Sequence, residues 1–166
     1  MAAIPRSSAW FEERDDASID WAVIGYFGLF GAAFMAATLL PAQSELVLAA
    51  MIATGRQEVA ILLIVATAGN VLGSTVNWAI GRFLASKRDA RWFPVPARAL
   101  ARAERWYSRW GLWTLLLSWL PVVGDPLTLA AGLLRAPIAA FIAIVTIAKA
   151  ARYVFIAAAV LGFAAR

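Results

Sequence analysis

The sequence contains neither histidine nor cysteine. Histidine is the commonest proton relay, general base and metal ligand in proteins, so its absence argues against histidine-dependent phosphatases, zinc proteases and haem proteins. Without cysteine the chain can form no disulfide and offers no thiolate nucleophile. The sequence also lacks an aspartate-rich metal motif of the phosphatidyltransferase kind. We therefore expect a protein that is not an enzyme and that holds no metal ion and no cofactor.

Charged residues are scarce as well. They make up 15% of the 166 residues, whereas hydrophobic residues make up 63%; soluble domains are about 45–50% apolar and about 25% charged. This composition predicts an integral membrane protein with one domain. Within the net charge of +5, acids concentrate in residues 1–20 and basic residues in 82–110. Because basic loops stay on the cytoplasmic side, the loop at 82–110 is predicted to be cytoplasmic and does not indicate nucleic-acid binding.

The apolar segments define the domain organisation. Residues 1–18 are polar and lack the basic start and the clear cleavage site of a signal peptide, so we expect them to be retained. The remainder is predicted to be a single all-α membrane domain, made of a first repeat at about 29–81, a basic loop with an amphipathic helix at 82–111 and a second repeat at about 112–164. A homo-oligomer is compatible with this organisation.

Two segments, 59–81 and 138–163, are predicted to span the bilayer by their length. Residues 19–40 are also long enough to cross, but the repeat requires their second part to act as one arm of a hairpin. We expect a long tilted arm that enters from the outside, with the N-terminus on that side. Small residues suited to close helix packing occur in two groups: Gly25, Gly28 and Gly31, and then Gly69, Gly73 and Ser74.

Residues 112–134 are apolar at both ends and interrupted near the middle by Pro121 and by Gly124-Asp125-Pro126. As α-helices the two arms would measure roughly 14 Å and 12 Å, each about half of a ~30 Å hydrocarbon core. A proline disfavours helical conformation in the residue before it, so the chain cannot continue smoothly through the interruption. The pattern predicts a re-entrant helical hairpin with an acidic turn near the middle of the membrane.

A similar interruption occurs earlier, because Pro41-x-x-x-Glu45 matches Pro121-x-x-x-Asp125. The sequence Leu48-Ala49-Ala50 also falls within one residue of Leu129-Ala130-Ala131. A hairpin returns the chain to its starting side, whereas the span that follows it crosses. Two successive units of hairpin plus span must therefore have opposite orientations, which predicts an inverted repeat with two opposed re-entrant hairpins.

The acids at the two interruptions are candidates for ion coupling. An ionised carboxylate at the centre of a membrane costs at least ~2.5–3.5 kcal/mol, so Glu45 and Asp125 are expected to have a role. One interpretation is proton or cation coupling, because a nearby cation favours the charged form and desolvation favours the neutral form. The other is structural, since each acid can stabilise the N-terminus of a half-helix.

Lys149 and Arg152 lie one turn apart within the last predicted span. They are candidates for binding an anionic headgroup or phosphate, arginine as a fork and lysine as a point charge. Alternatively, they form ion pairs with Asp125 or Glu45 that neutralise the interior. Arg56 and Arg82 are further candidates for headgroup binding, although arginines at an interface commonly extend toward the headgroups. Supporting polar residues are Ser44, Asn70 and Asn77, of which the two asparagines suit hydrogen bonds between helices.

The basic loop contains a predicted amphipathic helix. Four arginines fall on one face, and apolar and aromatic residues cover the remainder: Arg98, Arg102, Arg105 and Arg109, then Leu100, Ala103, Trp106, Tyr107 and Trp110. This pattern predicts an interfacial helix that lies against anionic headgroups. Tryptophans near the same loop agree with that location.

These motifs together resemble the YqaA branch of the DedA family, also called SNARE-associated or VTT-domain membrane proteins. The resemblance covers about residues 27–160 and rests on motifs in order: Leu40-Pro41-x-x-Ser44-Glu45, Gly69-Asn70-x-x-Gly73, Asn77-x-x-x-Gly81-Arg82-Phe83, Leu117-Ser118-Trp119-x-Pro121-Val122-Val123-Gly124-Asp125, Ala131-Gly132 and Lys149-Ala150-x-Arg152-Tyr153. It implies two opposed re-entrant hairpins and a multi-pass protein of the bacterial inner membrane. It also implies transport or flipping of a lipid-linked phosphate, such as undecaprenyl phosphate, or of phospholipids, with coupling to an ion gradient, so that membrane lipids are the partners.

The chain departs from the family pattern in the second hairpin. Family members carry arginines at the positions of Ser118 and Gly124, so either Lys149 and Arg152 supply the cationic site or this branch moves a different substrate. Two alternatives to lipid transport also remain. The acids suit a small-ion or cationic-drug exchanger, and buried charges that only fix helix packing suit a non-transporting protein that organises the membrane.

Overall fold

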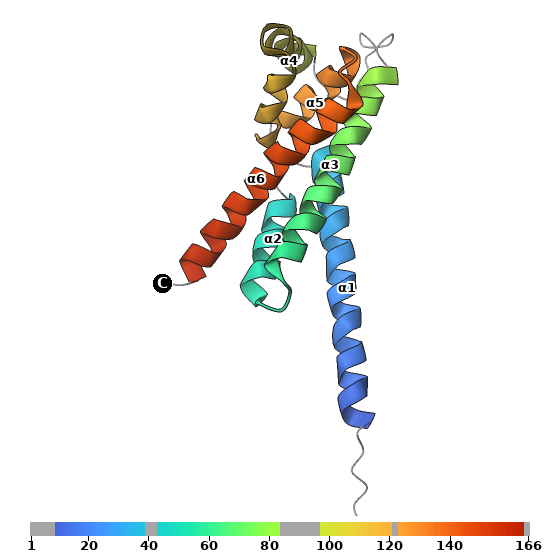
Figure 1. The fold of residues 1–166 in the computed structure, drawn as a ribbon, viewed down its shortest axis with the longest axis vertical. Helices are drawn as coiled ribbons and strands as arrows, with labels where there is room; N and C mark the ends of the chain where they lie inside the picture. Colours follow the sequence, from blue (N-terminus) through green and yellow to red (C-terminus); the bar gives the residue numbers. More distant parts are fainter. Residues whose placement is uncertain (1–8, 39–42, 84–96, 121–122, 165–166) are drawn as a thin grey trace, which may run out of the picture.

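The computed structural model describes residues 9–38, 43–83, 97–120 and 123–164, which form helices and the short turns between them (Figure 1). In chain order the elements are α1 (Ala9–Thr38), α2 (Gln43–Thr54), α3 (Val59–Phe83), α4 (Ala97–Trp110), the 3₁₀-helix η2 (Gly111–Trp119), α5 (Gly124–Leu133) and α6 (Ile138–Ala164). The predicted all-α fold is confirmed for these residues.

Within the described residues, two helices are long and apolar enough to cross a membrane, judged by length and composition: Val59–Phe83 in α3 and Ile138–Phe163 in α6. They correspond to the two spans that the sequence predicts. The apolar part of α1 is shorter and covers Trp21–Ala37. The helix itself begins at Ala9, so it extends back into the acidic N-terminal segment.

A short helix begins after each predicted interruption. Glu45 lies in the first turn of α2, and Asp125 lies in the first turn of α5. The positive end of the helix dipole stabilises a carboxylate at this position. Pro126 also suits the first turn, where its missing N–H would have had no helical partner. The prolines at the interruptions, Pro41 and Pro121, lie outside the described residues.

The first arm of the second helix pair is not the α-helix that we expected. Gly111–Trp119 forms a 3₁₀-helix, and at about 2.0 Å per residue it extends roughly 18 Å instead of ~14 Å. Gly111 has a φ of 59° where the chain turns from α4 into η2. The extra length carries the chain further from α4 before it turns back into α5.

The two helix pairs approach the middle of the molecule from opposite ends (Figure 1). The chain rises through α1 and descends through α2, whereas η2 leads down from α4 and α5 returns toward the start of α6. The long helices α3 and α6 run in opposite directions and cross beside these pairs. This arrangement supports two opposed helix pairs; their re-entry into a membrane and the inverted repeat stay predictions.

Glycines bring α3 close to both of its main neighbours. A Cβ at Gly69 or Gly73 would lie 2.5 or 2.6 Å from a carbonyl oxygen of α1. A Cβ at Gly132 of α5 would lie 2.0 Å from the carbonyl oxygen of Trp78 in α3. The predicted packed face of α3 is therefore confirmed. The expectation of close packing was wrong for Gly28 and Gly31 in this chain, because nothing lies within 4 Å of a Cβ at either.

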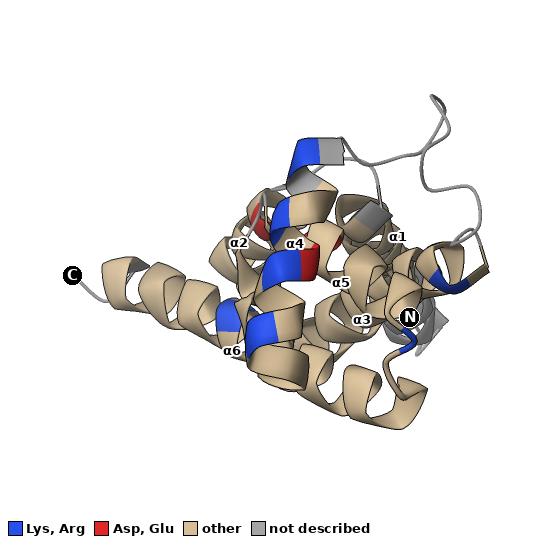
Figure 2. Cartoon of the chain, turned by 90° about the horizontal axis from the view of Figure 1, so that it is seen from above, with Lys and Arg blue, Asp and Glu red and all other residues tan. Residues whose placement is uncertain are grey.

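Helix α4 covers the second helix pair. Its residues Leu100 and Ala103 are buried in one cluster with Leu127, Leu129 and Ala130 of α5, and Trp106 packs against that cluster. Part of the apolar face of α4 is thus covered by α5, while Trp110 on the same helix is 64% exposed. Contact of this helix with headgroups stays a prediction. Figure 2 shows basic positions along this helix, and the four arginines on it are exposed.

Candidate functional site

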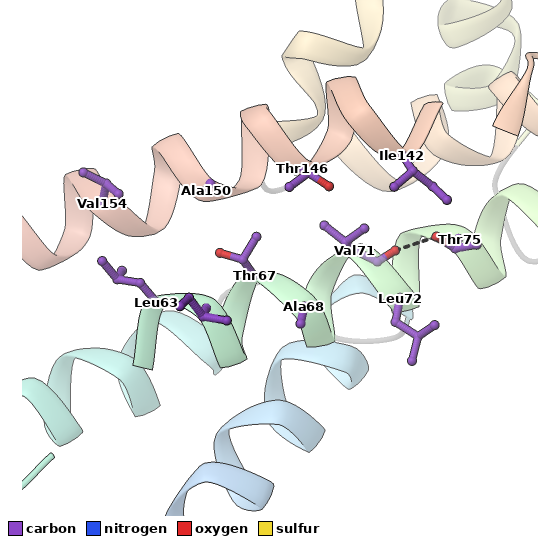
Figure 3. Close-up of a pocket in the computed structure, with 11 residues that line it drawn as sticks. Leu63, Thr67, Ala68, Val71, Leu72, Thr75, Ile142, Thr146, Ala150 and Val154 are labelled. Atoms are coloured by element: carbon purple, nitrogen blue, oxygen red, sulfur yellow. Dashed lines mark hydrogen bonds between the residues drawn. The ribbon is translucent and has the colours of Figure 1, made fainter. Parts of the chain in front are cut away.

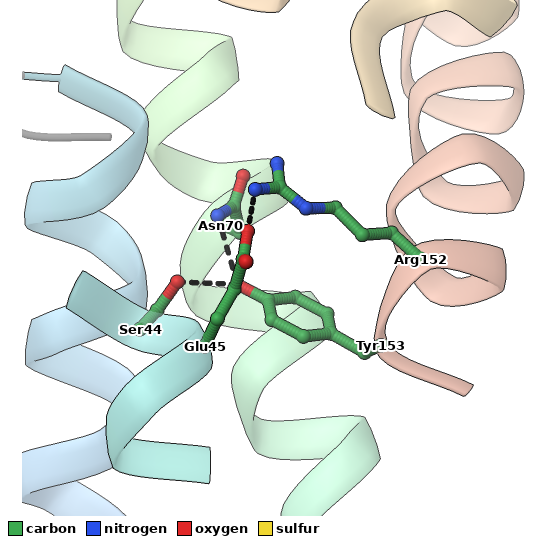
Figure 4. A network of polar contacts seen from close by, with 5 residues as sticks. All are labelled: Ser44, Glu45, Asn70, Arg152 and Tyr153. Atoms are coloured by element: carbon green, nitrogen blue, oxygen red, sulfur yellow. Dashed lines mark hydrogen bonds and ion pairs between the residues drawn. The ribbon is translucent and has the colours of Figure 1, made fainter. Parts of the chain in front are cut away.

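A polar network joins α2, α3 and α6 in the interior (Figure 4). The guanidinium of Arg152 forms an ion pair with the carboxylate of Glu45. Next to it, the Asn70 side-chain amide donates a hydrogen bond of 2.9 Å to the Tyr153 hydroxyl, and Ser44 and Tyr153 share a hydrogen bond of 3.0 Å between their hydroxyls. These contacts join the N-terminal turn of α2 to the middle of both long helices.

The network is well shielded from its surroundings. Tyr153 is 1% exposed and Ser44 is 3% exposed, and the side chains of Arg152 and Glu45 are 13% and 27% exposed. An ion pair in such surroundings is costly to break, because removal of one partner leaves the other charge buried without compensation. We call these five residues, Ser44, Glu45, Asn70, Arg152 and Tyr153, the first centre.

Further polar residues of the interior lie on η2, α3, α5 and α6. Lys149 of α6 is 3% exposed, and its ammonium attracts the carboxylate of Asp125 in α5. These two side chains form no direct ion pair. Ser74 of α3 and Ser118 of η2 are 0% and 1% exposed, and neither hydroxyl has a hydrogen-bond partner within the described part of the chain. We call Ser74, Ser118, Asp125 and Lys149 the second centre.

Helix α6 supplies the cation of each centre. Lys149 and Arg152 are three residues apart, which separates them by roughly 60° around the helix and about 4.5 Å along it. This offset directs Arg152 to the acid of α2 and Lys149 toward the acid of α5. The structure therefore brings both predicted acids close to predicted cations, and it selects the pairing of Glu45 with Arg152.

The other predicted site residues lie elsewhere. Arg56 is exposed in the turn before α3, and Arg82 is exposed in its last turn. Nearly the whole length of α3, roughly 35 Å at 1.5 Å per residue, separates them. Neither belongs to a centre, and their role in headgroup binding stays a prediction. Asn77 donates a hydrogen bond of 2.7 Å to the carbonyl oxygen of Ala37, so it joins α3 to α1, while Asn70 joins α3 to α6.

Three residues of the centres were not among the predicted site residues. Tyr153 stands four residues after Lys149, on nearly the same face of α6, and this spacing could have identified it. Ser74 was assigned only to helix packing. Ser118 was considered only as a departure from the family pattern. A hydroxyl gives no signal in a hydropathy profile, and only the packed helices show that these two have no partner.

Grooves are also present outside the centres. One, of about 580 Å³, runs between α3 and α6 (Figure 3) and is lined largely by apolar side chains such as Leu63, Val71 and Ile142, with the threonines Thr67, Thr75 and Thr146 among them. Another, of about 640 Å³, lies on α4 between Arg98, Arg102 and Arg105 and ends at Leu134. Among the described residues, no three acidic side chains gather in a way that could hold a metal ion.

Comparison with known proteins gives a consistent result. The family model described as the VTT domain matches residues 40–161. The chain is 43% identical over 136 residues to the inner membrane protein YqaA of Escherichia coli, which covers 82% of this chain and 91% of that protein; YqaA of Shigella flexneri gives the same values. An uncharacterized protein of Haemophilus influenzae is 35% identical over 133 residues, or 76% of this chain and 81% of that protein. No solved structure matches.

Proposed function

We propose that this chain, which belongs to the VTT-domain (DedA) family, is a multi-pass inner-membrane protein. In this proposal it moves lipids across the bilayer. The transported lipid would be a lipid-linked phosphate or a phospholipid, and transport would be coupled to an ion gradient. The name of the Escherichia coli relative supports the location. The substrate and the coupling are what the resemblance to the family implies, and the charges of the two centres support them.

The observation that carries this proposal is the pairing of charges along α6. Each interruption between helices presents one acid, and α6 presents one cation to each acid. Ionisable residues inside a membrane are rare and commonly mark a pathway for substrates or ions. Half-helix termini that meet near the middle of a membrane form substrate and ion sites in transporters built from repeats. An anionic headgroup can replace an acid as the partner of a cation.

Ion coupling follows when an anionic headgroup competes with an acid for the same cation. When a headgroup takes the place of Glu45 or Asp125, the displaced carboxylate becomes an unpaired charge in surroundings of low polarity. Uptake of a proton or another cation removes this cost. Entry of an anionic headgroup would thus be linked to entry of a cation. The apolar groove between α3 and α6 (Figure 3) supplies a surface for acyl chains beside these helices.

The test is a lipid-flipping assay in proteoliposomes that carry a fluorescent anionic phospholipid. We expect Glu45→Gln, Asp125→Asn and Lys149→Ala each to lower the rate at least about tenfold, since each removes one of the charges that the proposed mechanism uses. Arg56→Gln, which changes an exposed arginine outside both centres, is the matched control and should flip lipid at the wild-type rate. Wild-type rates in all three variants would rule out this mechanism.

A second function is favoured by the closed geometry of the first centre. Its ion pair and hydrogen bonds fasten three helices together, as expected of a protein that organises the membrane without transport. Glu45→Gln combined with Arg152→Gln separates the two functions. This variant removes both charges and keeps similar shapes, so a purely structural role would survive the change while ion-coupled flipping would not.

A further inference from the structure

The first centre contains a buried oxygen atom that its hydrogen bonds leave unused. The side-chain carbonyl of Asn70 accepts no hydrogen bond from any residue that the structure describes, although Asn70 is only 5% exposed. The amide nitrogen of the same side chain is held by the Tyr153 hydroxyl, so the carbonyl oxygen is turned away from that hydroxyl (Figure 4). Buried polar groups are nearly always hydrogen-bonded, so this acceptor calls for an explanation.

Other oxygen atoms lie around this carbonyl. The Tyr153 hydroxyl is 2.9 Å from the Asn70 amide nitrogen and 3.0 Å from the Ser44 hydroxyl, so these two side chains meet at one phenol oxygen. Ser44 directly precedes Glu45 in the first turn of α2. The first centre thus gathers a carboxylate, an amide carbonyl and two hydroxyls. Ligand sets made only of oxygen suit hard metal cations.

The charge of the first centre selects the charge of such a cation. Glu45 is the one acid among its five residues, and the guanidinium of Arg152 neutralises it. A carboxylate that loses its cationic partner in surroundings of low polarity is costly, so a replacement must restore the balance of charge. A monovalent cation does so, whereas a divalent cation leaves an excess positive charge.

The position of Glu45 favours a metal cation over a proton. Glu45 lies in the first turn of α2, where the positive end of the helix dipole stabilises the ionised carboxylate. A proton on this carboxylate is donated to one acceptor, whereas a metal cation is shared by several oxygen atoms at once. Those oxygens include the carbonyl of Asn70, which thereby gains the partner that it lacks.

We propose that the first centre binds a monovalent alkali cation. The ligands are the carboxylate of Glu45, the side-chain carbonyl of Asn70 and the hydroxyl of Ser44, and Tyr153 positions the last two. The cation and the guanidinium of Arg152 are alternative partners of Glu45, so the cation enters when Arg152 turns to another anion. Only the event that frees Glu45, the arrival of an anionic headgroup at Arg152, rests on the proposed function.

Binding is measured by thermal unfolding of the purified protein in neutral detergent micelles. Choline chloride is replaced stepwise by sodium chloride or potassium chloride at constant pH and ionic strength, so that only the identity of the cation changes. We expect a saturable rise of the melting temperature with sodium or potassium. At a hundredfold excess over the dissociation constant the rise should be roughly 5 °C or more. The difference between the two salts identifies the preferred cation.

The variants have distinct expected results. Glu45→Gln and Asn70→Ala should each weaken binding at least about tenfold, because each removes a ligand from a buried site. Arg152→Gln should bind the cation more tightly than the wild-type protein, since it removes the competing guanidinium. Asn77→Ala is the matched control: Asn77 is also a buried asparagine of α3, but it bonds to the Ala37 carbonyl outside the first centre. This variant should respond to salt as the wild-type protein does.

Two outcomes would overturn the proposal. One is a melting temperature that does not distinguish sodium and potassium from choline. The other is wild-type affinity in both Glu45→Gln and Asn70→Ala; if Asn70→Ala does not fold, Ser44→Ala, which lacks a single oxygen atom, takes its place and should bind about threefold more weakly.

Failure of this inference and failure of the proposed function are distinguishable. A protein that binds the cation through these residues but flips no lipid retains the cation site and contradicts lipid transport. Conversely, lipid flipping at an unchanged rate in choline chloride, by a protein that binds neither sodium nor potassium, overturns the cation site and leaves lipid transport in place.

Discussion

At the level of single residues, the contact between Arg152 and Glu45 is the one that most constrains the interior. It joins α6 to the first turn of α2, and Tyr153 next to it bonds to both Ser44 and Asn70. For this contact the side chain of Arg152 extends from α6 to the first turn of α2. The polar groups beside it, the hydroxyls of Ser44 and Tyr153 and the amide of Asn70, are neutral, so none of them replaces a charged partner.

Arg152→Gln is therefore expected to destabilise the protein by about 2–4 kcal/mol, because Glu45 then remains as an unpaired, half-buried charge. Adding Glu45→Gln to this variant should recover most of the loss. The measurement is thermal unfolding in detergent micelles, with Arg56→Gln as the exposed control expected to change stability by less than about 0.5 kcal/mol. A double variant as unstable as Arg152→Gln alone would contradict the assigned pairing.

The residues of the first centre were largely accessible to sequence reasoning, and their pairing was not. Charged residues in an apolar chain are conspicuous, so Glu45 and Arg152 could be singled out directly. Helical periodicity places Lys149 and Arg152 on adjacent faces, but it does not say which acid each one meets. That choice depends on how α2 and α5 pack against α6, which is a property of the folded chain.

At the level of the elements, the close approach of α5 to α3 is fixed by glycine. Gly132 has the backbone of Trp78 directly beside it, at 2.0 Å from the position that a Cβ would take. A rigid backbone cannot move aside as a flexible side chain can. The contact therefore sets the distance between α5 and α3.

Gly132→Ala should consequently destabilise the protein by about 1–3 kcal/mol or more, because the added methyl group forces the two helices apart. Gly28→Ala is the matched control: it lies in α1 with nothing within 4 Å of a Cβ, and alanine there should be neutral or stabilising by up to about 1 kcal/mol. Thermal unfolding of both variants tests this contrast. Equal stability of Gly132→Ala and the wild-type protein would contradict the described packing.

Element types were predicted less well than element positions. Hydropathy located the arm before Pro121, but an apolar stretch has the same hydropathy as an α-helix or a 3₁₀-helix, so η2 was missed. The periodicity of α4 separated an arginine face from an apolar face correctly. Periodicity does not say what packs against an apolar face, and here α5 covers the part of it that contains Leu100 and Ala103.

At the level of the whole molecule, the lack of native cysteine makes the topology directly measurable. Three exposed positions mark the ends of the elements: Arg56 before α3, Ser108 on α4 and Arg135 between α5 and α6. If η2 and α5 form a re-entrant hairpin, positions 108 and 135 lie on the same side of the membrane. Position 56 then lies on the opposite side, because α3 crosses between them.

We expect a membrane-impermeant thiol reagent, applied to inside-out vesicles, to label Ser108→Cys and Arg135→Cys but not Arg56→Cys. The same reagent applied from the periplasmic side should label only Arg56→Cys. Labelling of positions 108 and 135 from opposite sides would show that η2 and α5 together cross the membrane, and it would remove the inverted repeat. The parent chain, which lacks cysteine, is the background control.

Composition predicted a membrane protein, and segment length predicted the two helices that are long and apolar enough to span. The opposed orientation of the helix pairs was suggested by the match between the segments around Pro41 and Pro121. Both prolines lie outside the described ranges. The inverted repeat that their match predicts therefore stays a prediction. What the folded chain adds is the crossing of α3 and α6, which brings the two acids close to a single helix.

That shared helix means that the two halves of the molecule cannot change their ion partners independently. Arg152 and Lys149 are one turn apart on the same continuous α-helix. A shift of α6 along its axis that moves one of them away from its acid therefore moves the other by the same distance. Events at the two interruptions are thereby mechanically linked, with no flexible segment between them to absorb the movement.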